Sequence, residues 1–89
     1  MKDITKVRIP KQFYHIMLMV YDSKNQLAGI YERPVVGWRK LYQQVVEAHT
    51  GEKETYTLKL YGVGGDDPTV ATGTPILEEV INGQTGDNK

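Results

Sequence analysis

The longest apolar stretch of the chain, FYHIMLMVYD from Phe13 to Asp22, is apolar at nearly every position. Such a run predicts a β-strand with two apolar faces, because successive side chains of a strand point to opposite sides. Its even positions place Tyr14, Ile16, Leu18 and Val20 on one face, and its odd positions place Phe13, His15, Met17, Met19 and Tyr21 on the other. The turn-rich DSKNQ and the apolar LAGIYERPVV come next, so we predict a hairpin with a bulge or a close approach at Gly29.

From Trp38 the spacing of apolar residues changes from two to three or four. Trp38, Leu41, Tyr42 and Val45 follow the period of a helix, and Gly51 is a natural cap at its C-terminal end. The chain has a single tryptophan, and we expect its indole to be buried against the even face of the first apolar strand.

Three further segments carry weaker patterns. ITKVRIP (residues 4–10) alternates and predicts a short half-exposed strand that ends at Pro10. ETYTLKLYG (54–62) predicts a strand with Tyr56, Leu58 and Leu60 inward and with Thr55, Thr57, Lys59 and Tyr61 outward. VGGDDPTVATG (63–73) predicts a loop in which Val70 and Ala71 pair briefly.

The C-terminal segment TPILEEVING has the signals of a short helix. Thr74 is placed to cap it, Pro75 suits its first position, acidic residues follow, and Gly83 stands just beyond its end. We expect residues 84–89 to form a disordered tail and residues 1–83 to form a single domain.

These elements predict an α+β fold in the order β-β-β-α-β-α. A small antiparallel sheet of three to four strands packs on one main helix, and a short helix ends the domain. The order of hairpin, helix and strand resembles the first half of a β-grasp, ubiquitin-like fold. That resemblance concerns the order of elements and implies no activity.

Composition places the chain among ordinary folded proteins. It has 89 residues, of which 39% are apolar and 25% charged, and folding at this length yields a modest core. The absence of cysteine excludes disulfides, thiolate metal sites and cysteine nucleophiles. The first residues lack the apolar core of a signal peptide, and the apolar run of residues 13–21 is shorter than the roughly 20 residues of a membrane helix. We therefore expect a cytoplasmic protein.

The net charge is zero, but the two halves of the chain differ. Residues 1–40 carry eight basic and three acidic side chains, and residues 41–89 carry three basic and eight acidic ones. Such asymmetry can mark contact with nucleic acid or an acidic protein. The simpler interpretation is that the two halves lie side by side and neutralise each other.

No set of residues predicts catalysis, a metal or a cofactor. Ser23, His15 and His49 are the only serine and histidines, and no nucleophile motif surrounds Ser23. HTGEK (49–53) matches a zinc-finger linker, but no cysteine accompanies it. Asp66 and Asp67 suit a turn better than a calcium loop, because the alternating ligands of an EF-hand are missing. We expect no enzyme activity.

The start of the predicted main helix carries Arg39 and Lys40, where the helix dipole favours acidic side chains. Together with Arg33 they form a candidate site for an anion or an acidic partner. The alternative is ordinary solvated surface charge.

The odd face of the first apolar strand is the second surface feature. One helix covers one face of a small sheet, so this face needs another cover, either the predicted C-terminal helix or a second chain. The candidate partner-binding residues are therefore Phe13, His15, Met17, Met19, Tyr21, Lys59 and Tyr61.

These features favour a non-enzymatic protein that binds a protein partner or forms a homodimer. Its size suits a small accessory protein of the kind that phages and mobile elements encode. The alternative is a nucleic-acid-binding module, with Phe13, Tyr21 and Tyr61 stacking on bases and with basic residues around them. The near-neutral isoelectric point of about 6.7 counts against that alternative.

Overall fold

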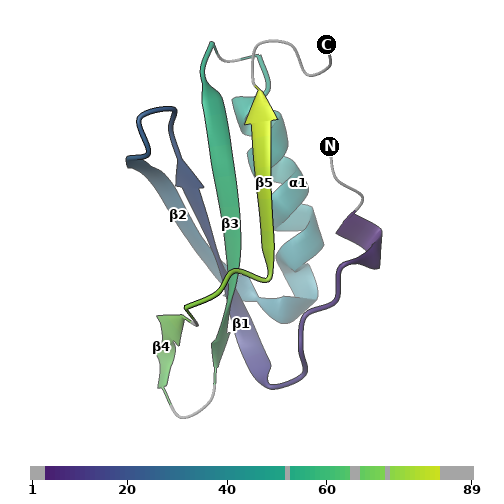
Figure 1. Cartoon of the computed structure of the whole chain (residues 1–89). Coiled ribbons are helices and arrows are strands. Elements are labelled where there is room, and N and C mark those ends of the chain that lie inside the picture. The colour runs from purple at the N-terminus through teal and green to yellow at the C-terminus, as the bar shows by residue number, and fades with distance from the viewer. Residues whose placement is uncertain (1–3, 52, 65–66, 72, 83–89) are drawn as a thin grey trace.

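The computed structural model describes residues 4–51, 53–64, 67–71 and 73–82. Five strands and one α-helix make up most of these residues (Figure 1). The strands are β1 (Phe13–Tyr21), β2 (Leu27–Pro34), β3 (Thr55–Gly64), β4 (Asp67–Ala71) and β5 (Leu77–Asn82). The helix is α1 (Trp38–His49), and two 3-10 turns, η1 (Ile4–Lys6) and η2 (Val35–Gly37), precede β1 and α1. The predicted α+β fold with an antiparallel sheet is confirmed.

The predicted hairpin is confirmed as β1 and β2. Asn25 has a positive φ of 63° in the connecting turn, and the backbone N–H of Asn25 donates to the carbonyl of Asp22 over 2.9 Å. The pairing runs from His15 opposite Pro34 to Val20 opposite Gly29, and then shifts so that Tyr21 lies opposite Leu27. Ala28 is therefore the extra residue of a bulge beside Gly29. A Cβ at Gly29 would lie 3.3 Å from the ring of Tyr31, so this glycine also marks a close approach.

The sheet has the order β2-β1-β3, and β4 and β5 both pair with the outer edge of β3. β4 lies against the end of β3, with Val63 opposite Ala71, whereas β5 lies against its first part, from Thr55 opposite Asn82 to Leu60 opposite Leu77. All described strand pairs are antiparallel. The structure has the order of hairpin, helix and strand on which the resemblance to the β-grasp fold is based.

Helix α1 supplies one side of the core. Trp38 is 3% exposed, as expected from the sequence, and Tyr42 is fully buried. Gly51 follows the helix with a φ of 96°, a conformation that suits glycine and ends the helix as predicted. The core beneath α1 comes from the predicted inward positions of β1 and β3: Ile16, Leu18, Val20, Tyr56, Leu58 and Leu60.

The predicted C-terminal helix is wrong, because β5 occupies this segment. Leu77 is 5% exposed and lies opposite Leu60, and Ile81 packs on the core opposite Tyr56, whereas Val80 is 63% exposed. The alternation is that of a strand. Capping signals are worth only about 1 kcal/mol, whereas pairing along β3 satisfies a whole row of backbone groups and also buries Leu77.

Two other sequence predictions are corrected in part. The segment 4–10 is not a strand: η1 takes its first residues, Ile4 is 2% exposed, and Val7 and Ile9 pack on the core from beside α1. The predicted loop over 63–73 contains β4, and the brief pairing expected there is confirmed for Ala71. The predicted tail 84–89 lies outside the described residues.

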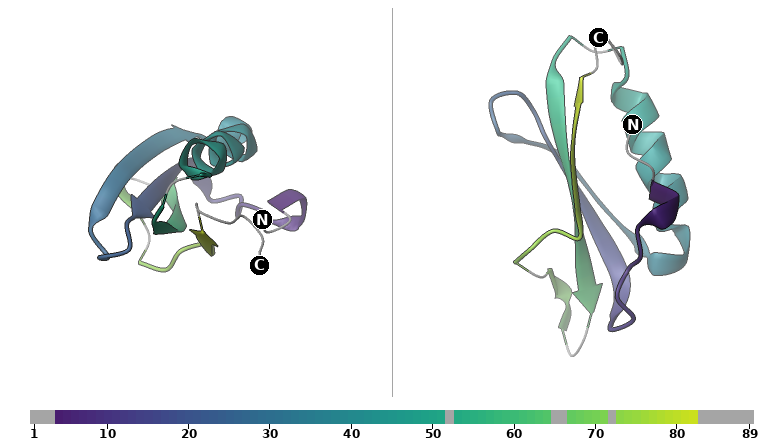
Figure 2. Two further views of the ribbon diagram at one scale, coloured as in Figure 1. Left: turned by 90° about the horizontal axis from the view of Figure 1, so that it is seen from above. Right: turned by 45° about the vertical axis from the view of Figure 1, so that its right-hand side comes forward.

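Figure 2 shows α1 along one side of the sheet, with η1 beside it. No described element lies over the other side. The fold therefore has two layers over the described ranges, and we call the uncovered side of the sheet the open face.

Candidate protein-binding face

Strand register decides which side chains lie on the open face, because directly paired residues point to the same side of a sheet. Met19 lies opposite Ile30 on one neighbour and opposite Lys59 on the other, and Lys59 in turn lies opposite Glu78. These four residues form one row across four strands. A second row holds Glu32, Met17 and Tyr61, and a third holds Leu27, Tyr21, Thr57 and Val80.

Most side chains of the open face are more exposed than their neighbours in sequence, but Val63, which lies opposite His15 at the end of β3, is fully buried. Leu18 and Val20 on the α1 side are fully buried, whereas Met17, Met19 and Tyr21 are half-buried. Towards the edges of the sheet exposure rises, to 52% for Ile30 and 63% for Val80. An apolar band therefore runs along β1 and the facing part of β2, and Thr57 and Lys59 on β3 separate it from Val80 on β5.

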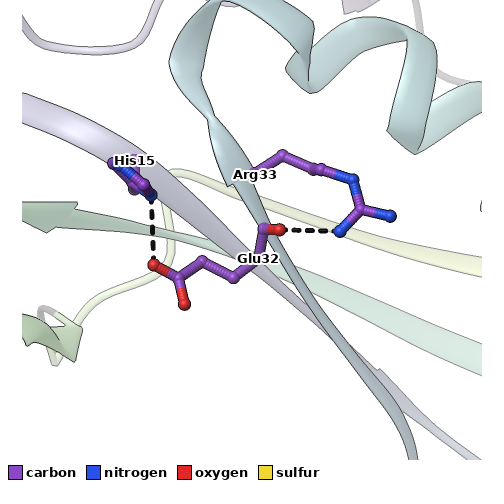
Figure 3. A network of polar contacts seen from close by, with 3 residues as sticks. All are labelled: His15, Glu32 and Arg33. Carbon is purple, nitrogen blue, oxygen red and sulfur yellow. Dashed lines mark hydrogen bonds and ion pairs between the residues drawn. The ribbon is translucent and has the colours of Figure 1, made fainter.

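His15 and Glu32 form the polar end of the open face (Figure 3). His15 Nδ1 lies 3.1 Å from Glu32 Oε2, close enough for an ion pair when the imidazole is protonated, although the two groups are not oriented for a hydrogen bond. The side chains are 40% and 47% exposed, although the Nδ1 atom of His15 is itself buried. Arg33 turns away from this pair in Figure 3 and donates from Nη1 to the carbonyl oxygen of Glu32 over 2.7 Å.

Lys59 is the permanent cation in the middle of the open face. Its Nζ lies 5.2 Å from the centroid of the Tyr21 ring, a cation–π contact, and its cross-strand neighbour is Glu78. The Tyr21 hydroxyl donates to the sulfur of Met19 over 3.7 Å. With Glu32 and Glu78 on the same face, carboxylates outnumber permanent cations there.

Phe13 does not share this face, contrary to the sequence prediction. Phe13 lies opposite Gly64 and His15 lies opposite Val63, so Tyr14 is the extra residue of a bulge. Gly64 and Val63 point to opposite sides, and the bulge therefore turns Phe13 to the α1 side, where its ring lies over Gly62. Tyr14, predicted on the core face, is 65% exposed for the same reason. The other six predicted partner-binding residues lie on the open face.

The three predicted anion-binding residues lie away from the open face. Arg33 lies opposite Ile16 and therefore on the α1 side of β2. Arg39 donates from Nε to the carbonyl of Ile4 over 3.2 Å and from Nη2 to that of Val7 over 3.0 Å, so it holds the N-terminal segment against α1. Lys40 is exposed in the first turn of α1.

Sequence reasoning missed five residues of the open face: Ile30, Glu32, Glu78, Val80 and Leu27. The signal for the first two was present, since Ile30 and Glu32 alternate along the predicted partner strand. Glu78 and Val80 could not be found while their segment was taken as a helix.

The serine and the two histidines contact different partners within the described part of the chain. Ser23 Oγ donates to Glu54 over 3.1 Å, and His49 Nδ1 lies 2.9 Å from the carbonyl of Val45, so each is engaged apart from the other. No group of three or more metal-binding side chains occurs within the ranges that the structure describes. In the same ranges, no helix has the length and apolar character needed to cross a membrane.

Comparison of the chain with protein-family models, curated proteins and solved structures found no match. The geometry of the open face is therefore the basis for a functional proposal.

Proposed function

We propose that the chain is a non-enzymatic, cytoplasmic accessory protein that binds a protein through the open face of its sheet. A second copy of the chain is the first candidate for that partner. The observation that carries the proposal is the band of apolar side chains on a sheet face that no described element covers. Soluble proteins rarely leave such a band exposed unless it contacts another molecule.

The chemistry of the band suits a protein surface. Met17 and Met19 are flexible, polarisable side chains that adapt to a partner, and tyrosines such as Tyr21 and Tyr61 are enriched at protein interfaces. Burial of each apolar side chain yields about 1.5 to 3 kcal/mol when it is complete, and these side chains are only half-buried in the single chain. A docked protein would bury the exposed part of these side chains and so supply the rest of this free energy.

The polar groups around the band favour a protein over a nucleic acid. Lys59 is accompanied by Glu32 and Glu78 on the open face, and carboxylates repel a phosphate backbone. Arg33 and Arg39, which the nucleic-acid alternative would place around the aromatic side chains, lie on the α1 side. The same mixed charges suit the polar rim of a protein interface.

The test is the effect of Met17→Lys on self-association. We expect the wild-type chain to have the mass of two chains at about 100 µM, a concentration at which weak dimers form, and the Met17→Lys variant to have the mass of one. The substituted ammonium would face Glu32 across the strands, so the fold should tolerate it. Size-exclusion chromatography with light scattering gives the mass, and circular dichroism with urea denaturation gives the stability.

Gln43→Lys is the matched control, because it adds the same charge at an exposed position of α1. It should leave the mass of the wild-type protein unchanged. A wild-type mass of one chain at every concentration would exclude the second copy as the partner. Unfolding of Met17→Lys at low denaturant would show instead that Met17 supports the core of its own chain.

A further inference from the structure

A groove of about 370 Å³ lies between the N-terminal segment and the start of α1. Arg8 and Lys11 approach it from the residues before β1, and Val35, Val36, Trp38 and Arg39 approach it from η2 and the first turn of α1. The lining residues belong to η2, α1 and the segment before β1, and α1 lies on the side of the sheet away from the open face (Figure 2), so the groove is separate from the open face.

The groove has one sign of charge. Arg8, Lys11 and Arg39 line it, and no acidic side chain is among its lining residues. Three cations around one concavity raise the local concentration of anions. Three of the eight basic residues of the N-terminal half thus line one groove.

Two features of α1 strengthen this positive potential. Its first turn contains no acidic residue, and Gly37 at its start provides no capping side chain, so the positive end of the helix dipole is not neutralised there. The guanidinium of Arg39 is fixed by its hydrogen bonds to the carbonyls of Ile4 and Val7 and by its position 5.2 Å from the centroid of the Trp38 ring. A cation held in place loses little entropy when it binds an anion.

The rest of the groove is apolar. Val36 is 96% exposed, Val35 is half-buried, and the indole of Trp38 forms part of the lining. A simple phosphate ion would leave this surface wet, whereas a peptide that alternates acidic and aliphatic side chains would satisfy both kinds of lining. We propose that the groove binds an acidic peptide segment of a partner protein, with its carboxylates on Arg8, Lys11 and Arg39 and an aliphatic side chain against Val35 and Val36. This proposal does not depend on the open face.

The test uses the peptide acetyl-Glu-Leu-Asp-Glu-Leu-amide as the probe and the fluorescence of Trp38, the single tryptophan of the chain, as the readout. We expect saturable binding with a Kd below about 1 mM, weakening as salt rises. Arg8→Gln and Lys11→Gln should each raise the Kd by about 1.4-fold to fivefold, the range for loss of one exposed ion pair. Lys24→Gln, which removes an exposed cation from the hairpin turn, should leave the Kd unchanged.

Two further measurements test whether binding depends on the acidic side chains of the peptide and whether it involves the open face. The neutral peptide acetyl-Gln-Leu-Asn-Gln-Leu-amide should fail to saturate, and Met17→Lys should bind the acidic peptide like the wild-type chain. The proposal is overturned if the acidic peptide does not saturate or if the neutral peptide binds equally well. It is also overturned if inorganic phosphate binds as tightly as the peptide, or if Lys24→Gln weakens binding as much as Arg8→Gln.

Discussion

At the scale of single residues, the contact between Gly62 and Phe13 fixes the end of the sheet. Gly62 lies opposite Ile16 on the α1 side, and a Cβ built on it would lie 2.4 Å from Cδ2 of the Phe13 ring. The absence of a side chain at Gly62 therefore leaves room for the ring that the bulge at Tyr14 turns inward.

We expect Gly62→Ala to lower the free energy of unfolding by about 1 to 3 kcal/mol, the usual cost of overpacking. Alanine in a strand otherwise stabilises relative to glycine, so a loss would come from the clash. Urea denaturation measures the change, and Gly73→Ala is the control because nothing lies within 4 Å of its Cβ. The double variant Phe13→Ala with Gly62→Ala should lose less than the sum of the single variants. Strict additivity would show that the ring does not lie over Gly62.

Tyr42 is the residue through which α1 holds β5. It is fully buried, and its hydroxyl donates to Glu79 Oε1 over 2.7 Å. Burial raises the pKa of the Tyr42 hydroxyl well above its ordinary value, and the hydrogen bond to Glu79 and the negative charge of that carboxylate raise it further.

This raised pKa predicts a loss of stability in alkali. In the unfolded chain tyrosine titrates near pH 10, so the stabilisation is complete below about pH 10 and is lost as the pH rises above it, while the folded chain keeps the proton. At about pH 11 the wild-type chain should have lost roughly 1 kcal/mol more than Tyr42→Phe, measured by urea denaturation at pH 8 and pH 11. Tyr14→Phe, at a position that is 65% exposed, should follow the wild-type curve. Parallel curves for Tyr42→Phe and the wild type would contradict the prediction.

At the scale of elements, β5 shows how pairing overrides local helix signals. The segment has a capping residue, a proline suited to a first helical turn and early acidic residues, yet it extends along β3. In a helix Leu77, Val80 and Ile81 would share one face, whereas in β5 Val80 lies on the opposite side from the other two.

This difference can be measured by alanine substitution. Leu77→Ala should cost about 2 to 4 kcal/mol because Leu77 is 5% exposed in the core, and Val80→Ala should cost less than about 1 kcal/mol because Val80 is on the open face. Urea denaturation of both variants gives the comparison. Equal losses at the two positions would favour a helix.

At the scale of the whole molecule, charge is distributed between two surfaces. Arg8, Lys11 and Arg39 line the groove at the start of α1, and the open face carries mixed charge around its apolar band. Neither surface provides the long row of cations that a nucleic-acid backbone requires.

We therefore expect a fluorescein-labelled single-stranded DNA to bind weakly at low salt and to be released by about 150 mM salt, because few phosphates would be neutralised. Fluorescence anisotropy over a salt series measures this release. Binding at low micromolar concentration in about 150 mM salt, weakened by Lys59→Ala, would instead favour the nucleic-acid alternative.

The sequence by itself determined β1, β3 and α1, whose periodic signals are long, but the short alternation of residues 4–10 did not mark a strand. The alternation along β1 and β3 predicted which residues are inward, and the spacing from Trp38 to Val45 predicted α1 and the burial of its indole. It also predicted that His15, Met17, Met19, Tyr21, Lys59 and Tyr61 lie on the side of the sheet away from α1. These predictions hold because periodicity records which side of an element meets the core, and that side is set within a few residues of chain.

Only the tertiary structure decided the remainder. The C-terminal segment forms β5 because it pairs with the free edge of β3. Residues 4–10 lie outside the sheet because Ile4 packs in the core beside α1 and Arg39 donates to the carbonyls of Ile4 and Val7. Phe13 changed sides because a single extra residue, Tyr14, reverses the alternation. Each outcome depends on a partner that is distant in the sequence or on a register shift, and local patterns carry neither.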